Sequence, residues 1–188
     1  MNAAVVVAVI AGSVSIVGWF VSNLLNARSE RRRIRLTARL AHVEKQLEEL
    51  YGPLAVLIYE GKASFRDLLT TLGRPHVFGA DRPVPQKDLD LWLFWVDHDL
   101  MPRNAAVQQL LATKSHLIEE DDFPASFHQF VEHYNAWRVS HLRWKEEGVP
   151  YPWHSKTNWP DAFDDDVITT YRELLARHSR LIGAVARG

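Results

Sequence analysis

The residues of this sequence that come closest to a metal-binding group are three neighbours, Asp97, His98 and Asp99. Carboxylate oxygens and imidazole nitrogens are common protein ligands of divalent metals. Neighbouring residues on a helix point about 100° apart, so at most two of the three can face one metal ion. A site would need histidines from other helices, of which His116 is the first candidate, followed by His133, His141 and His178.

One interpretation is that Asp97, His98 and His116 bind a metal. The simpler one is that histidines such as His141 lie at the edge of an apolar stripe, where each has a hydrogen-bond partner and binds no metal. No HExxH or Glu-x-x-His pair of the kind found in helical metalloproteins occurs in the sequence. We therefore expect no cofactor and keep the metal site as the alternative.

No catalytic signature accompanies these residues. The sequence has no GxSxG elbow and no glycine-rich phosphate loop followed by GK[ST]. It has no cysteine, which excludes disulfides, thiolate metal sites and cysteine nucleophiles and fits a reducing compartment. These absences favour a protein that is not an enzyme.

Lys114 is a charged residue on an otherwise apolar helical stripe. An unpaired ammonium group is costly to bury. We therefore expect Lys114 to form a structural ion pair with Asp97 or Asp99 on a neighbouring helix.

The elements that position these residues begin with an uncharged segment, residues 3–25. As a helix, 23 residues span roughly 34 Å, enough to cross a hydrocarbon core of about 30 Å. Trp19 and Phe20 lie near its end, where aromatic residues sit at a membrane interface. We predict a transmembrane anchor over residues 1–27. A cleaved signal peptide is the alternative, but the segment lacks a basic start and a small-residue cleavage site.

Small residues recur along this segment at intervals that bring them to one helix face. Such residues let a second membrane helix approach closely, although an alanine-rich segment also produces the spacing by chance. They predict packing against another membrane protein or a second copy of the chain. The residues are Ala4, Ala8, Gly12, Ser15, Gly18 and Ser22.

A cluster of arginines, here called the arginine collar, follows the apolar segment. Basic residues beside a membrane helix stay in the cytoplasm and are attracted to anionic lipid headgroups. The collar therefore predicts a bacterial inner (cytoplasmic) membrane protein with its N-terminus outside. The rest of the chain is mildly acidic, which does not fit a nucleic-acid partner. The collar consists of Arg28, Arg31, Arg32, Arg33, Arg35 and Arg39.

The periodicity of the remaining sequence predicts an all-α protein. A basic juxtamembrane helix should span residues 28–50, with apolar residues at alternating steps of four and three. Gly52 and Pro53 predict a kink, followed by a second helix to Leu72. Residues 51–188 should then form a cytoplasmic helical bundle. Its further helices are expected over residues 88–100 (buried), 102–118, 124–147 and from about residue 164 onward, with loops over residues 73–86 and 148–160.

Aromatic residues in the second loop have two interpretations. Exposed tryptophan and tyrosine side chains are frequent in binding hot spots, so the loop is a candidate partner-binding surface. The alternative is that the rings close the end of the bundle. The residues concerned are Tyr151, Trp153, His154 and Trp159.

Three short motifs carry a resemblance: Leu50-Tyr51-Gly52-Pro53-Leu54, MPRN at residues 101–104 and KSHLI at residues 114–118. With these motifs the chain resembles a group of bacterial proteins with one N-terminal anchor, a Tyr-Gly-Pro-Leu kink and a small helical domain. The resemblance implies this architecture and a bacterial origin. It implies no activity.

Together these features predict a membrane-anchored accessory or scaffold protein. It would dock on a membrane protein complex or a cytoplasmic partner through its anchor and its helical domain. Two alternatives remain: a metal- or histidine-dependent enzyme on a helical bundle, and a membrane-acting effector of a bacterial defence or toxin system.

Overall fold

The structure, a computed structural model, describes residues 3–78, 84–120, 122–151 and 158–187, with side chains at positions 19 and 20 and from Ser22 onward. Within these ranges it contains helices and connecting segments and no strand, which confirms the predicted all-α class. The chain divides into two units, residues 1–43 with 176–188, and residues 44–175.

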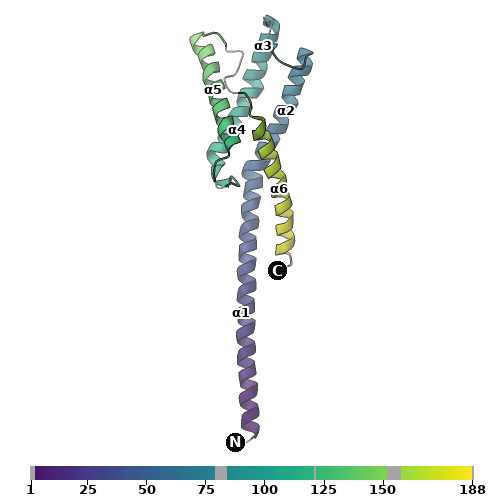
Figure 1. Ribbon diagram of the computed structural model, residues 1–188, viewed down its shortest axis with the longest axis vertical. Helices are drawn as coiled ribbons and strands as arrows, with labels where there is room; N and C mark the ends of the chain where they lie inside the picture. The colour runs from purple at the N-terminus through teal and green to yellow at the C-terminus, as the bar shows by residue number, and fades with distance from the viewer. Residues whose placement is uncertain (1–2, 79–83, 121, 152–157, 188) are drawn as a thin grey trace. The chain divides into compact units, whose positions relative to one another are not determined.

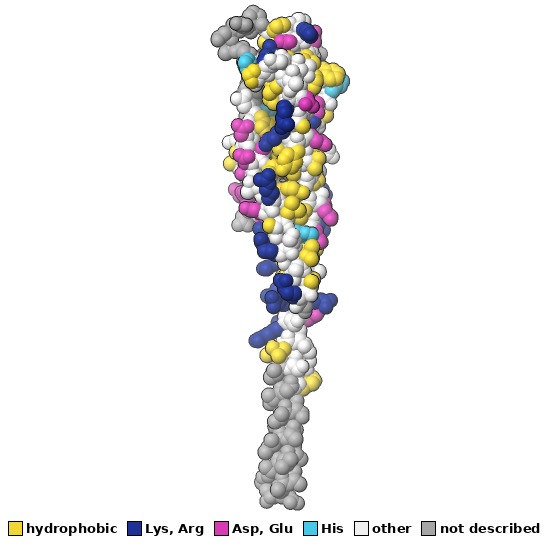
Figure 2. Space-filling model, turned by 90° about the vertical axis from the view of Figure 1, so that its right-hand side faces the viewer, with side chains coloured by type: hydrophobic (Ala, Val, Ile, Leu, Met, Phe, Trp, Pro, Cys, Tyr) yellow, Lys and Arg dark blue, Asp and Glu magenta, His cyan; other side chains and the backbone are white. Residues whose placement is uncertain are grey.

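The first unit contains most of α1 (Ala3–Gln46) and the end of α6 (Asp161–Val185). The six arginines of the collar are all exposed on α1, and Trp19 and Phe20 are 68% and 65% exposed. Figure 2 shows dark blue basic side chains directly above yellow apolar ones at the lower end of the described surface. Among the described residues, which leave out most side chains before Ser22, no helix is long and apolar enough to cross a membrane.

The second unit contains α2 (Gly52–Leu72), α3 (Gln86–Trp95), α4 (Met101–Lys114), α5 (Ala125–Glu147) and the start of α6. In Figure 1, α4 lies between α2 and α5 and makes contacts with both. Each helix predicted for this part of the chain is present. The expected ends of α2 and α5 are confirmed by Gly73 and Gly148, whose φ angles of 66° and 68° favour glycine.

The predicted kink at Gly52-Pro53 takes the form of a π-turn. Leu47–Tyr51 is a five-residue π-helix between α1 and α2, and the Gly52 amide donates to the Leu47 carbonyl five residues earlier. Proline has no amide hydrogen, and its ring would collide with the carbonyl four residues earlier in a regular helix. The wider π-turn accommodates Pro53 while the chain remains helical.

The helix predicted to begin at Pro102 is present as α4, with the proline in its first turn, but no break separates it from α3. A second π-turn, Val96–Leu100, joins α3 to α4, so the chain remains helical through the proline. The Met101 amide donates to the Val96 carbonyl, and the same arrangement of π-turn, one residue and proline occurs as at Pro53. The helix predicted over residues 88–100 was expected to be buried. Trp92 and Val96 are buried, whereas Phe94 is 57% exposed.

Two groups of aromatic side chains lie in the core of the second unit. One surrounds Trp92, which packs edge-on against Trp137 with ring centroids 5.6 Å apart. The other joins α5 to the start of α6, where Phe163 is fully buried and stacks on Phe130 at 4.8 Å. Burial of such rings supplies a large part of the stability of a small helical domain.

Candidate functional site

A cavity of about 630 Å³ lies within the second unit. Its walls come from α2, from the continuous run of α3 and α4, from α5, and from residues 158–164. Cavities of this size and mixed lining are typical of small-molecule sites. Its apolar wall includes Leu57, Phe65, Trp92, Trp137 and Trp159.

Asp164 lies in the cavity wall with both carboxylate oxygens occupied. Lys62 Nζ lies 3.0 Å from Oδ2, and Trp159 Nε1 donates to Oδ1 at 3.0 Å. Burial raises the pKa of Asp164 and outweighs the lowering effect of Lys62 and Trp159. The carboxylate is therefore satisfied by its neighbours but is costly to keep charged.

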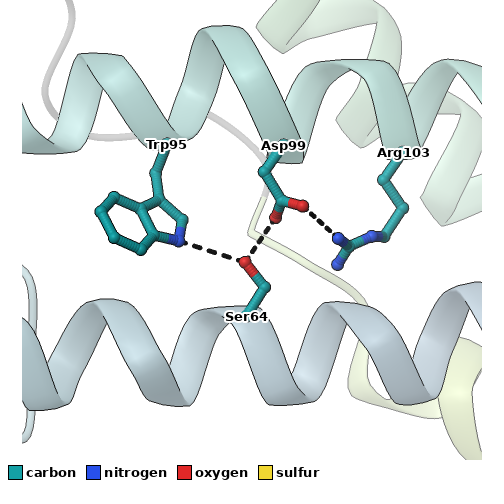
Figure 3. A network of polar contacts seen from close by, with 4 residues as sticks. All are labelled: Ser64, Trp95, Asp99 and Arg103. Carbon is teal, nitrogen blue, oxygen red and sulfur yellow. Dashed lines mark hydrogen bonds and ion pairs between the residues drawn. The ribbon is translucent and has the colours of Figure 1, made fainter.

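Arg103 enters the cavity from α4 and is held by a network that joins two helices. Asp99 accepts from Arg103 and from Ser64 Oγ at 2.6 Å, and Trp95 Nε1 donates to Ser64 Oγ at 3.1 Å. Figure 3 shows Ser64 on α2 facing the other three residues across the gap between the helices. The network fixes the guanidinium through one of its nitrogens, Nη2.

The second terminal nitrogen of Arg103 is buried and has no hydrogen-bond partner in the described part of the chain. Gly61 on α2 makes room for it, because a Cβ atom there would lie 3.1 Å from Nη1. A buried donor without an acceptor costs about 1–3 kcal/mol. This nitrogen is therefore enclosed by the protein beside Gly61 and is not exposed to the cavity.

Asp97, a predicted metal ligand, is used in an ion-pair cluster. His141 Nε2 lies 2.7 Å from Asp97 Oδ1, and Lys145 Nζ lies 2.8 Å from the same oxygen. Burial raises the pKa of this carboxyl, but the hydrogen bonds from Lys145 and His141 outweigh it and leave the pKa below its usual value. The histidine is therefore held by a hydrogen bond, as the simpler interpretation expects.

The other two predicted ligands lie elsewhere. His98 is exposed and packs on Phe94 at a centroid distance of 4.6 Å, and His116 is also exposed. Across the described ranges, no three histidine, aspartate or glutamate side chains come together as a metal would require. The structure therefore does not bring Asp97, His98 and His116 into one site.

The predicted partner of Lys114 is wrong. Lys114 Nζ pairs with Glu49 Oε2 at 2.5 Å, whereas Asp97 and Asp99 bind the groups described above. The hydrogen bond and charge of Lys114 lower the pKa of Glu49. The expectation of a structural ion pair holds, with Glu49 in the π-turn as the partner.

The aromatic loop residues divide into two groups. Tyr151 is partly buried against His141 and Trp144, and burial raises its pKa to about 12. Trp159 packs on Phe130. The rings of Tyr151 and Trp159 therefore pack against the helices of the unit. Trp153 and His154 lie outside the described residues, and their partner-binding role stays a prediction.

Sequence reasoning missed Arg103 and Asp164 as cavity residues. One available signal was Gly61, a poor helix former placed in the middle of an apolar stripe. A glycine at such a position often marks a close approach by another group. The sequence alone does not show that this group is Arg103.

Comparison of the chain with protein-family models, curated proteins and solved structures finds no match in any of the three. The resemblance to a group of bacterial anchored proteins therefore stays an expectation.

The raised pKa of Asp164 predicts a pH-dependent effect of the Asp164→Asn substitution. A carboxyl whose pKa is raised by folding binds its proton more tightly in the folded state, so stability rises as pH falls through that pKa. Asp164→Asn should therefore stabilise the protein near pH 7, and the advantage should shrink as the pH is lowered and the natural carboxyl becomes protonated. Urea unfolding of the full chain at several pH values measures this difference.

The exposed neighbour Asp165 supplies a matched control. Asp165→Asn should change the free energy of unfolding by less than about 0.5 kcal/mol. A destabilising effect of Asp164→Asn at pH 7 would show that the Lys62 ion pair outweighs the burial of Asp164.

Proposed function

We propose that the chain is a membrane-anchored accessory protein. Residues 1–27 would span the bacterial inner membrane with the N-terminus outside, and the helical domain would lie in the cytoplasm. The domain would dock on a membrane protein complex or a cytoplasmic partner, with the anchor contributing to the contact.

The single observation that carries this proposal is the order of features along α1. An uncharged segment of 23 residues is followed immediately by the arginine collar on the same continuous helix. Trp19, Phe20 and Leu25 are exposed, and exposed apolar side chains so close together are unfavourable in water. A lipid bilayer with an anionic cytoplasmic surface would cover these side chains and attract the arginines.

The docking part of the proposal rests on two surfaces. The small residues of the anchor have the spacing at which membrane helices associate. In the helical domain, Val56 and Tyr59 of α2 are 55% and 50% exposed and lie three residues apart, on one helix face. Some charged groups of the domain pair with one another, such as Lys62 with Asp164 and Arg74 with Asp88, which fits a structural role.

Membrane insertion and orientation form one testable prediction. The full chain should stay with membranes at high salt and alkaline pH, and a reporter fused after Gly188 should register the cytoplasm. Each arginine beside an anionic leaflet contributes about 1 kcal/mol, so Arg31→Gln with Arg32→Gln should send a measurable fraction of chains to the opposite orientation.

The same change of charge on α6, Arg172→Gln with Arg180→Gln, is the control and should leave the orientation unchanged. Release of the full chain by alkaline extraction would contradict the anchor. A reporter signal from outside the cytoplasm would contradict the predicted orientation.

Docking predicts a defined partner. The full chain purified in mild detergent should carry a stoichiometric partner chain or form a homo-oligomer. Gly12→Ile with Gly18→Ile should reduce that association while leaving membrane insertion intact, because larger side chains keep helices apart. Val6→Ile with Val14→Ile keeps the anchor apolar and is the matched control. A homogeneous monomer from the unaltered chain would contradict docking.

A further inference from the structure

The charged side chains that line the cavity of the second unit balance one another. Among the described residues of the lining, Arg66 and Asp161 are exposed and carry opposite charges. The other charged groups of the lining form two ion pairs, Lys62 with Asp164 and Arg103 with Asp99. A charged ligand is costly to remove from water unless the site supplies an unpaired opposite charge. The lining therefore favours a ligand without net charge.

Asn104 supplies a neutral polar group to this cavity. It lines the cavity from α4 and is only 6% exposed. Its side-chain amide forms no hydrogen bond within the described part of the chain, although a buried polar group is normally hydrogen-bonded. In contrast to Arg103 Nη1, this amide is not fully enclosed by the protein, so its remaining surface is accessible from the cavity.

The chemistry of a primary amide determines which group would pair with Asn104. The amide has an NH₂ donor beside a carbonyl acceptor. A lactam edge, in which a carbonyl lies beside an N–H, matches both and forms two parallel hydrogen bonds. Asparagine recognises the edge of adenine by the same kind of two-bond pairing.

The aromatic side chains of the lining describe the rest of the ligand. Trp92 and Trp137 pack edge-on with ring centroids 5.6 Å apart, and the hydrogen bond from Trp159 Nε1 to Asp164 holds a third ring in place. Rings that are already ordered lose little entropy when a flat ligand packs against them. A volume of about 630 Å³ accommodates a small molecule with a fused ring system.

We propose that this cavity binds a small neutral heterocycle, with a lactam or nucleobase edge paired to the Asn104 amide and its ring against the tryptophan wall. The proposal is independent of the membrane anchor and adds a ligand-binding activity to the accessory role. The ligand would pair the donor and the acceptor of Asn104 and cover apolar side chains of the lining.

Three probes that share one ring system test the proposal. The first, 2-quinolone, is neutral and has the lactam edge; N-methyl-2-quinolone lacks the N–H donor; quinoline-2-carboxylate is an anion. Their binding is measured by isothermal titration calorimetry on the full chain in phosphatidylcholine nanodiscs, with empty nanodiscs as the blank. We expect 2-quinolone to bind at least about tenfold more tightly than N-methyl-2-quinolone, because the methylated probe leaves the Asn104 carbonyl unpaired. Quinoline-2-carboxylate should also bind more weakly than 2-quinolone.

The role of Asn104 is tested by Asn104→Leu, which should remove the preference for 2-quinolone over its N-methyl form. This variant loses no hydrogen bond within the described chain, and leucine is the better helix former, so we expect it to fold. Gln108→Leu is the matched control, since Gln108 lies one turn further along α4 and outside the cavity lining. This control should keep the full preference. Far-UV circular dichroism checks that both variants are folded, and the three-probe comparison on the unaltered chain decides the question if Asn104→Leu is not.

Three outcomes would overturn the proposal. One is that none of the three probes binds. Another is that 2-quinolone and its N-methyl form bind equally well, or that quinoline-2-carboxylate binds best. The last is that a folded Asn104→Leu variant retains the preference for 2-quinolone.

Discussion

Each of the two long helical runs of this domain has to accommodate a proline in its interior. Pro53 and Pro102 each remove a helical hydrogen bond, and each ring would collide with the carbonyl four residues earlier. In both runs the proline is accommodated by a five-residue π-turn that ends two residues before it. An extra residue in the turn rotates the following helix face by about 100°, so these turns determine which side chains point inward.

The cavity depends on these two turns. The α2 wall, with Leu57 and Gly61, begins within two turns of Pro53, and the α4 wall, with Leu100 and Arg103, lies directly around Pro102. If either helix were rotated about its axis, Gly61 would no longer lie beside Arg103, and Ser64 would no longer contact Asp99. The two walls are therefore positioned by backbone geometry near the prolines, and the polar network then locks them together.

Buried polar contacts also hold the first π-turn against the segment that follows α4. Gln46 is fully buried and donates through Nε2 to the Leu117 carbonyl at 3.0 Å and to Glu119 at 2.9 Å. The Glu119 amide donates to the Tyr51 hydroxyl at 3.2 Å, and burial raises the pKa of that hydroxyl. These bonds tie the first π-turn to the segment after α4. Because such groups are costly to bury unpaired, they favour a single arrangement of the two helices.

The sequence predicted the helices well because their signals are local. Apolar spacing, Gly73 and Pro124 were sufficient to place α2 and α5 within a residue or two. Proline was interpreted as a helix boundary at position 102, since the π-turn that accommodates it has no local signature. Ion-pair partners were harder still: Lys114 was expected to pair with Asp97 or Asp99, and Glu49 is 65 residues away from it in the chain. The cavity residues Arg103 and Asp164 depend on the same long-range geometry.

The stability of the Gly52→Ala variant tests most directly whether the first π-turn is required. Alanine is the better helix former by about 1 kcal/mol, and Gly52 has an ordinary helical φ of −62°. A Cβ atom at Gly52 would nevertheless lie 2.4 Å from the Leu47 carbonyl oxygen. We therefore predict that Gly52→Ala lowers the free energy of unfolding, measured by urea denaturation of the full chain. Gly183→Ala, whose Cβ would meet only the flexible end of Arg187 at 3.4 Å, should raise it. Stabilisation of the protein by Gly52→Ala to the same extent as by Gly183→Ala would contradict this account.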